Sequence, residues 1–269
     1  MPAEIDATEW FSSIYKPTPT IIQAAQALYK GHSVKEISRS DAGTINLGAT
    51  TATIADIIDD AKYNQKKSIC FVTGVPGAGK TLAGLNIANE RHNIDQGEHA
   101  VFLSGNGPLV DVLQEALARN EVAEKKGTYD ALTKAQSLTK TKAFIQNIHH
   151  FRDYALQTEK PPIEHVAVFD EAQRAWTEAK ATAFMATKKG IANFNMSEPE
   201  FLISTLDRHP DWATIVCLIG GGQEINTGEA GLSEWFNAIE KSFPHWNVYV
   251  SDTLTDREYT NGQDIYSSV

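Results

Sequence analysis

The residues best suited to chemistry in this sequence lie between Gly74 and Thr81, which read GVPGAGKT and match the pattern G-x-x-x-x-G-K-[ST] at every fixed position. Glycines allow positive φ, so the backbone can curl its N–H groups into an anion-binding nest at a helix N-terminus. The lysine of this pattern reaches the β- and γ-phosphates of a nucleotide, and the hydroxyl of its last residue ligates Mg²⁺. The residues expected to bind the phosphates of ATP are Gly74, Val75, Pro76, Gly77, Ala78, Gly79, Lys80, Thr81 and Leu82.

An acidic pair lies ninety residues after Lys80 and directly follows an apolar run. The run, residues 165–169 (HVAVF), indicates a buried strand. At the end of such a strand, Asp170 would hold the water shell of Mg²⁺ and Glu171 would polarise an attacking water. Two acidic residues alone are a weak signal, but this spacing after a phosphate-binding loop indicates hydrolysis. Lys80 and Glu171 are therefore candidate catalytic residues, and Asp170 is a candidate metal ligand together with Thr81.

Apolar runs also predict the strands that position these residues. Several of the runs are followed by a polar turn and then by a segment whose apolar residues have helical spacing. This alternation of strand and helix is typical of a parallel sheet. Ser104 and Asn106 follow one predicted strand, so they would lie at the carboxyl edge of the sheet, where such folds bind ligands. We predict an α/β fold with three layers around a central, mostly parallel sheet. Its strands are expected near residues 68–73, 100–104, 165–169, 214–219 and 246–250.

Polar and glycine-rich segments suggest the domain boundaries. Residues 1–48 are expected to form an N-terminal helical extension, residues 49–255 the nucleotide-binding domain, and residues 256–269 a loose tail. Helices predicted near residues 20–31 and 49–61 are expected to pack on one edge of the sheet.

The segment from about residue 121 to 160 is polar and rich in lysine, and residues 144–154 within it have the pattern of an amphipathic helix. Clustered basic and aromatic side chains are typical of a groove for single-stranded nucleic acid. A solvated helical insertion is the other interpretation. His149 and His150 have no Cys or third His at ligand spacing, which argues against zinc binding by this pair.

The composition limits the partners and the compartment. The chain has 269 residues with 24 basic and 34 acidic side chains, so its net charge of -10 would repel a phosphate backbone outside a local groove. Cys70 and Cys217 lie in apolar runs, as expected of core residues in a reducing compartment, and a disulfide between them is the alternative. Apolar runs stay well short of the roughly 18 residues that cross a bilayer. Since the N-terminus also lacks a signal-peptide pattern, we expect a cytoplasmic protein with no membrane partner.

Four segments together resemble a known family. Their sequences are GVPGAGKT, VFLSGNGPLVDVLQEAL, VAVFDEAQRAW and LIGGGQEINTGEAGLSEW. They resemble the helicase-like P-loop family described as domain of unknown function 2075, which is related to the Schlafen ATPase group and more distantly to superfamily 1 helicases. The resemblance extends from about residue 59 to residue 249. It implies the first RecA-like domain of a motor that hydrolyses ATP with Mg²⁺.

The resemblance also implies roles for residues outside the phosphate-binding loop. Ser104 and Asn106 would contact nucleic acid, and Gln173 and Gln223 would couple the γ-phosphate to it. Gln223 would also sense the γ-phosphate as a third catalytic residue, and the alternative is an exposed glutamine in a glycine-rich turn. Gln65, shortly before the first strand, would either read adenine or be a solvated linker residue.

Motors of this kind close two RecA-like domains over ATP, and the second domain supplies an arginine finger. Because this sequence ends at Val269, soon after the first domain, we expect either a fragment or a single-domain ATPase that receives its finger from a partner. Surface salt bridges are the simpler interpretation of Arg174, Arg208 and Arg257.

Three functions compete at this stage. The first is a Mg²⁺-dependent, helicase-like ATPase. The second is a nucleotide-gated module that docks a partner, for example in phage defence, with little hydrolysis on its own, since loss of an arginine finger can cost about 10³ to 10⁵ in rate. The third is a small-metabolite kinase, which the hydrolase-like acidic pair argues against.

Overall fold

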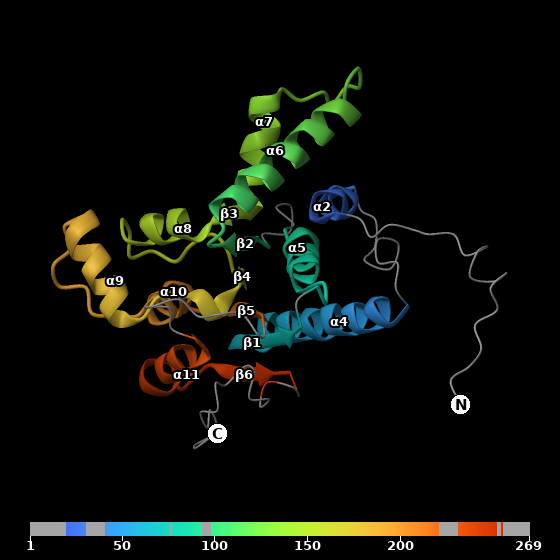
Figure 1. The fold of residues 1–269 in the computed structure, drawn as a ribbon. Helices are drawn as coiled ribbons and strands as arrows, with labels where there is room; N and C mark the ends of the chain where they lie inside the picture. The colour runs from blue at the N-terminus through green and yellow to red at the C-terminus, as the bar shows by residue number, and fades with distance from the viewer. Residues whose placement is uncertain are drawn as a thin grey trace, which may run out of the picture.

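The computed structural model describes residues 20–30, 41–75, 77–92, 98–220, 231–251 and 254, and the side chains of residues 41–46 lie outside this description. Within these ranges, six strands form one sheet in the order β3-β2-β4-β5-β1-β6, and every neighbouring pair is parallel (Figure 1). The strands are β1 (Lys67–Gly74), β2 (Ala100–Ser104), β3 (Ile145–Asn147), β4 (Val166–Asp170), β5 (Ala213–Gly220) and β6 (Asn247–Val250).

Burial on both faces explains why the central strands are continuous apolar runs. Ala100 and Phe102 belong to the hydrophobic cluster on one face of the sheet, and Val101 and Leu103 belong to the cluster on the other. Successive side chains of a strand point to opposite faces, so a strand covered on both sides needs apolar residues at every position.

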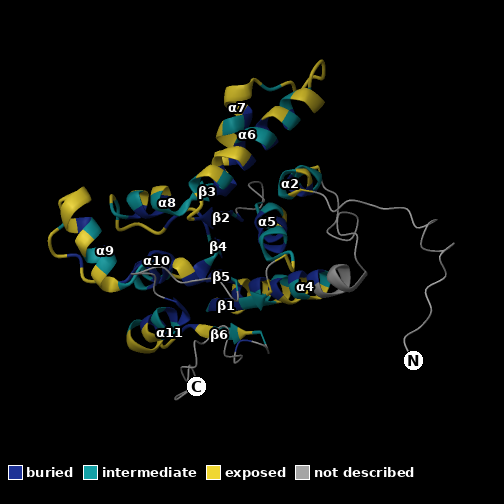
Figure 2. Cartoon of the chain, viewed as in Figure 1, coloured by how far each residue is buried: buried dark blue, intermediate teal, exposed yellow. Residues whose placement is uncertain are grey.

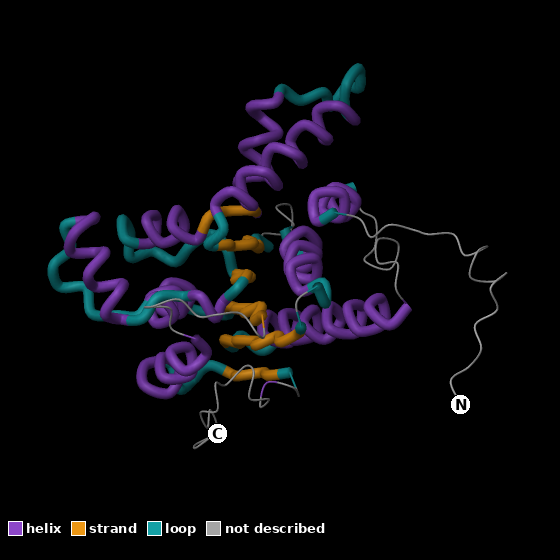
Figure 3. The backbone as a smooth tube through the Cα atoms, in the orientation of Figure 1, coloured by secondary structure: helices purple, strands orange, loops and turns teal. Residues whose placement is uncertain are grey.

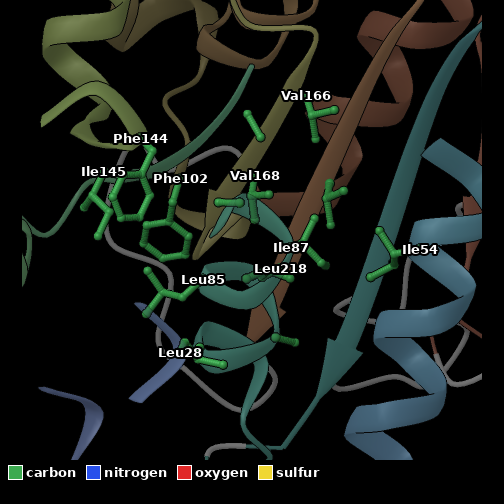
Figure 4. Packing of buried hydrophobic residues seen from close by; sticks show 14 of the residues in the cluster. Leu28, Ile54, Leu85, Ile87, Phe102, Phe144, Ile145, Val166, Val168 and Leu218 are labelled. Atoms are coloured by element: carbon green, nitrogen blue, oxygen red, sulfur yellow. The ribbon is translucent and has the colours of Figure 1, made fainter. Parts of the chain in front are cut away.

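Helices cover the first face of the sheet, seen edge-on in Figure 3. Their apolar side chains form one cluster with the strands, and Leu85 and Ile87 lie close to Phe102, Val168 and Leu218 in Figure 4. The helices contributing to this cluster are α2 (Ile21–Tyr29), α4 (Asp41–Tyr63), α5 (Lys80–Glu90), α6 (Gly107–Glu124) and α7 (Lys134–Phe144).

Helices also cover the second face, where Trp235 and Phe71 are almost fully buried. These helices are α8 (Ile148–Ala155), α10 (Glu198–Asp207), α11 (Gly231–Ser242) and the short η2 (Ala172–Arg174). A smaller apolar cluster lies beyond them around α9 (Glu178–Phe184) and η3 (Met185–Lys189). The predicted α/β fold, with three layers around a parallel sheet, is confirmed.

The N-terminal helices differ from the prediction. Helix α4 packs on a face of the sheet and not on one edge, because Leu47, Ile54 and Ile58 form an apolar stripe that lies against α5, β1 and β5. Helix α2 packs on α5 and α6. The expected boundary at residue 48 falls inside α4, which belongs to the same hydrophobic cluster as the sheet.

The single amphipathic helix predicted over residues 144–154 is wrong. Phe144 ends α7, Ile145–Asn147 forms the edge strand β3, and α8 begins at Ile148. The strand forms because it pairs in parallel with β2, a long-range contact that local periodicity does not show. Helices α6 and α7 pair with each other and project beyond the sheet, with much of their outer surface exposed (Figures 1 and 2).

Some predictions fall on residues that the structure does not describe. These are Pro76, Gln223, Arg257 and the tail at 256–269. Across the described ranges, none of the helices combines the length and the apolar character that crossing a bilayer requires.

Candidate functional site

The phosphate-binding loop has the strand-loop-helix setting that its sequence predicts. Strand β1 ends at Gly74 and helix α5 begins at Lys80. Gly77 and Gly79 have φ of 80° and 86°, in the left-handed region that glycine tolerates best. Since Gly79 is the N-cap of α5 and has no side chain, the first N–H groups of the helix receive no side-chain cap from it. These donors and the helix dipole suit an anion.

Lys80 lies over the loop that precedes it. Its Nζ donates to the carbonyl oxygen of Val75 at 3.0 Å and to that of Gly74. Burial lowers the pKa of Lys80, and the nearby carboxylates of Asp170 and Glu171 oppose this shift. The ammonium group is therefore half-buried with neutral partners, and an anionic phosphate would be a stronger partner for it.

Thr81 and Asp170 meet in the structure. The Thr81 hydroxyl donates to Asp170 Oδ1 at 3.2 Å and lies 3.4 Å from Oδ2. Burial raises the pKa of Asp170 to about 6, with the charge of Glu171 adding to the effect and Lys80 opposing it. A divalent cation beside this carboxylate would offset its burial, and a hydroxyl and a carboxylate are oxygen ligands that Mg²⁺ accepts. The residues present therefore fit a magnesium ion.

Helix α5, and not direct strand pairing, brings the two motifs together. Strand β5 lies between β1 and β4, so the strand before the loop and the strand before Asp170 are not neighbours. The first turn of α5 carries Thr81, and the helix packs against β4 and β5. Gly84 makes this packing close, because a Cβ at this position would lie 2.6 Å from Leu218 Cδ1 and 2.9 Å from Val168 Cγ1.

Glu171 adopts a backbone conformation that is rare outside glycine. Its φ is 52°, and such left-handed residues cost on the order of 1 kcal/mol and are frequent at functional sites. Its Oε2 accepts from Arg174 Nη1 at 3.0 Å, and both side chains are exposed to solvent. Glu171 lines a cleft of about 420 Å³ that also borders Asn106, His149 and Trp176.

Three hydrogen bonds hold the segment that follows Glu171. The buried Trp235 donates its Nε1–H to the carbonyl of Ala172 at 2.9 Å. Gln173 Oε1 accepts from the N–H of Gly220 at 3.2 Å, which joins the turn after β4 to the end of β5. The Trp176 N–H donates to Glu198 Oε2 at 3.0 Å. The turn that carries Glu171 is thus fixed to two neighbouring elements and one strand end.

Arg152 and Glu198 form a buried ion pair beneath the same cleft. Arg152 Nη1 lies 3.3 Å from Glu198 Oε1, and both side chains are at most 4 % exposed. The guanidinium also lies over the rings of Trp176 and Phe184, 5.2 and 4.8 Å from their centroids. Burial raises the pKa of Glu198, while the Trp176 N–H and Arg152 oppose this.

Sequence reasoning missed several residues of this site: Gly84, Arg152, Glu198 and Trp235. Two carried a usable signal. A glycine in the middle of a helix costs about 1 kcal/mol relative to alanine, so Gly84 needed a packing reason. A tryptophan buried in a core usually needs an acceptor for its N–H, which applied to Trp235.

Ser104 and Asn106 shape the turn after β2. The Ser104 side chain is buried, and its Oγ accepts from the N–H of Asn106 at 3.2 Å. Asn106 Oδ1 accepts from the N–H of Leu109 at 3.2 Å and so caps α6. Of the two predicted nucleic-acid contacts, Asn106 borders the cleft, and the buried Ser104 supports the turn behind it.

Three lysines of the lysine-rich segment pair with acidic residues. Lys125 and Lys140 lie 3.0 and 3.2 Å from Glu121 Oε1, and Lys134 lies 2.6 Å from Glu115. This pairing favours the interpretation of a solvated helical pair over that of a basic groove.

Arg208 has a structural role, and Gln65 lies at the surface. Arg208 donates to the carbonyls of Ala155 and Thr158 at 3.1 and 2.7 Å, beside the end of α8. Gln65 is exposed in the turn before β1, with a φ of 51°.

Comparison with solved structures gives distant matches. The helicase domain of Pyrococcus furiosus Hef is 16% identical with a TM-score of 0.37, over 77% of this chain and 40% of that chain. Drosophila ORC bound to DNA is 12% identical with a TM-score of 0.30, over 100% of this chain and 56% of that chain. The chain therefore spans less than two thirds of the length of either structure.

A search of curated proteins found no match. The model of one protein family matches residues 67–266, from the start of β1 past the end of β6, and so includes the loop, the acidic pair and all six strands described above. The chain belongs to the family described as Schlafen group 3, DNA/RNA helicase domain.

Proposed function

We propose that this chain is the first RecA-like motor domain of a helicase-like ATPase that binds ATP with Mg²⁺ and hydrolyses it. The observation that carries the proposal is the hydrogen bond between Thr81 and Asp170, which joins the phosphate-binding loop to the acidic pair at 3.2 Å. We also propose that the chain is related to the family called domain of unknown function 2075 and, more distantly, to superfamily 1 helicases. This part of the proposal rests on the four sequence segments.

Each residue has a specific role in the proposed reaction. Lys80 exchanges its loop carbonyls for the β- and γ-phosphate oxygens, and the N–H groups at the start of α5 hold the same anion. Thr81 and Asp170 would hold Mg²⁺, which would neutralise charge on the phosphates. Glu171 accepts a proton from the attacking water, and Gln223 senses the γ-phosphate. Gln173 lies between the ends of β4 and β5, a position suited to coupling the two motifs.

Nucleic acid is the proposed partner of the cleft beside Glu171. Trp176 and His149 lie with ring centroids 5.4 Å apart and border the cleft with Asn106. The parts of these rings that Arg152 and Lys180 leave uncovered are the proposed surface for stacking single-stranded bases. The net charge of -10 restricts such binding to a local groove. We further propose that a second RecA-like domain or a protein partner supplies the arginine finger. Cys70 and Cys217 are buried and unpaired, which supports a cytoplasmic location.

Equilibrium binding of a fluorescent ATP analogue with Mg²⁺ tests nucleotide recognition. Lys80→Ala should weaken binding at least about tenfold, because a hydrogen bond from a charged group contributes on the order of 1.5–3 kcal/mol. Lys126→Ala, at an exposed lysine far from the loop in sequence, is the control and should bind as the unaltered chain does. Equal affinity in Lys80→Ala and the control would contradict the proposal.

Turnover separates the competing functions. Phosphate release should rise when single-stranded nucleic acid is added to the full chain with Mg²⁺ and ATP. Tight ATP binding without release, with or without nucleic acid and a candidate partner, would instead indicate a nucleotide-gated docking module. Transfer of labelled phosphate to a small acceptor would indicate a kinase.

A further inference from the structure

Two histidines and an aspartate meet at the amino edge of the sheet, opposite to the edge that carries Thr81 and Asp170. His165 directly precedes β4, while His209 and Asp211 precede β5. The two strands are parallel neighbours, and the N–H of Thr214 donates to the carbonyl of His165 at 2.8 Å. The fold therefore places three metal-ligating side chains together that are far apart in sequence.

The three side chains lie close enough together for their ligand atoms to reach one metal ion. One ligand atom from each of His165, His209 and Asp211 lies within 4.8 Å of the others. His165 Nε2 and Asp211 Oδ1 are 3.6 Å apart. Two ligands bound to tetrahedral zinc at about 2.0–2.1 Å would be about 3.4 Å apart. Small side-chain rotations would bring this pair to coordination distance.

The second ring nitrogen of His209 has the partner that metal-bound histidines have. Its Nε2 lies 2.9 Å from the backbone carbonyl oxygen of Glu164 and donates to it. This bond places the proton of the neutral ring on Nε2 and leaves the lone pair of Nδ1 for a ligand. A backbone carbonyl is a common acceptor for the outer nitrogen of zinc-bound histidine.

Two buried polar atoms of the cluster, His165 Nδ1 and Asp211 Oδ1, have no partner at hydrogen-bond distance among the described residues. Asp211 Oδ1 faces His165 Nε2 at 3.6 Å, slightly too far for a hydrogen bond. Buried polar atoms are nearly always paired, so each unpaired one requires an explanation. A cation bound by Asp211 Oδ1 would satisfy that oxygen.

The packing around the cluster keeps the imidazoles neutral and oriented. Trp212 is buried and stacks on His165 with ring centroids 4.7 Å apart, and the rings of His165 and His209 lie 3.9 Å apart. Burial lowers the pKa of His209 to about 4, with the neighbouring His165 adding to the effect, and burial also lowers the pKa of His165. Neutral imidazole is the form that binds metal.

We propose that His165, His209 and Asp211 form a zinc site that joins the first residues of β4 and β5. Two imidazoles and a carboxylate suit Zn²⁺, whereas Mg²⁺ prefers oxygen ligands alone. Water completes the tetrahedral coordination, since Asp211 is partly exposed to solvent. The site is separate from the proposed nucleotide site and does not depend on ATP binding.

Calorimetric titration of the full chain with Zn²⁺, after dialysis against a chelator and with excess Mg²⁺ present, tests the proposal. The chain should bind one equivalent of Zn²⁺, and Co²⁺ should give the visible absorption of a tetrahedral site. Asp211→Asn and His165→Asn should each weaken Zn²⁺ binding at least about tenfold. His245→Asn is the matched control, because His245 contacts the carboxylate of Asp207 at 2.8 Å at an exposed position. It should bind Zn²⁺ as the unaltered chain does.

Circular dichroism during heating shows whether the variants fold and supplies a second readout. Zn²⁺ should raise the unfolding temperature of the unaltered chain and of His245→Asn, but not that of folded Asp211→Asn. Absence of Zn²⁺ binding, or equal affinity in Asp211→Asn, His165→Asn and the unaltered chain, would overturn the proposal. Loss of Zn²⁺ binding in Asp170→Asn alone would also overturn it, because the metal would then occupy the nucleotide site.

Discussion

Individual polar residues in this chain show how burial and charge are balanced. Glu121 is 6 % exposed and binds the hydroxyl of Ser137 and the ammonium groups of Lys125 and Lys140. Burial alone would raise the pKa of Glu121, but these three hydrogen bonds lower it below its ordinary value. A carboxylate with a lowered pKa stabilises the folded state above its unfolded pKa of about 4.3, and the contribution disappears as the pH falls through the folded pKa.

The corresponding prediction concerns stability against pH. Glu121→Gln should lower the free energy of unfolding by about 2 kcal/mol at pH 7, because bonds to a charged acceptor are lost. The difference from the unaltered chain should shrink below about pH 4, where Glu121 itself becomes protonated. Urea unfolding over a pH series measures this difference. Glu115→Gln is the control, because Glu115 pairs with Lys134 at a more exposed position, and it should lower the free energy of unfolding much less. If the effect of Glu121→Gln did not change with pH, the proposed role of the Glu121 carboxylate would be contradicted.

Among the elements, α5 determines how the nucleotide site is assembled. It approaches the sheet closely because Gly84 has no side chain to meet Leu218 and Val168. Gly84→Ala should lower the free energy of unfolding by about 1–3 kcal/mol, even though alanine favours a helix by about 1 kcal/mol over glycine. Urea denaturation measures the change. Gly105→Ala is the control, because an added Cβ at this position meets no atom within 4 Å, and it should not cause this loss. An increase in the free energy of unfolding for Gly84→Ala would contradict the close packing of α5 on the sheet.

The ion pair between α8 and α10 supports the turn after β4. Arg152→Met leaves Glu198 as a buried charge without its cation, which should cost about 3–5 kcal/mol of folding free energy. Arg119→Met is the control, because Arg119 is 71 % exposed and surface pairs contribute about 0–1 kcal/mol. Thermal unfolding compares the two variants. Similar small losses in both would mean that the pair contributes little to holding Trp176 and the turn.

At the scale of the whole molecule, the local sequence pattern predicted the strands that are buried on both faces and the loop between the first strand and its helix. The strands at 68–73 and 100–104 could be predicted because both of their faces are covered, which requires an uninterrupted apolar run. The phosphate-binding loop could be placed because its glycines, lysine and threonine occupy fixed positions between a strand and a helix. The meeting of Thr81 with Asp170 follows from the same alternation of strands and helices.

Features that depend on pairing between distant segments could not be predicted. Strand β3 has three residues inside a pattern that also fits a helix, and its pairing with β2 decides its structure. The positive φ of Glu171 could not be predicted, because none of the residue types next to it indicates a left-handed backbone. The acidic partners of Lys134 and Lys140 lie on the preceding helix α6, so these two ion pairs became clear only in three dimensions.

The amino edge of the sheet follows the same rule as its carboxyl edge. Residues that precede adjacent parallel strands meet there, just as residues that follow them meet at the carboxyl edge, so His165 and Asp211 were predictable neighbours once β4 and β5 were paired. The sheet thus has the proposed ATP site on one edge and the proposed zinc site on the other.

The most direct test of the proposed ATPase is phosphate release by Glu171→Gln at saturating Mg²⁺ and ATP, with single-stranded nucleic acid present. Glu171→Gln should bind ATP as the unaltered chain does but release phosphate about 10²- to 10⁴-fold more slowly, because it lacks the proposed general base. Glu159→Gln, at an exposed glutamate elsewhere, should release phosphate at the unaltered rate. Equal rates for Glu171→Gln and the unaltered chain would contradict a hydrolytic role for the acidic pair.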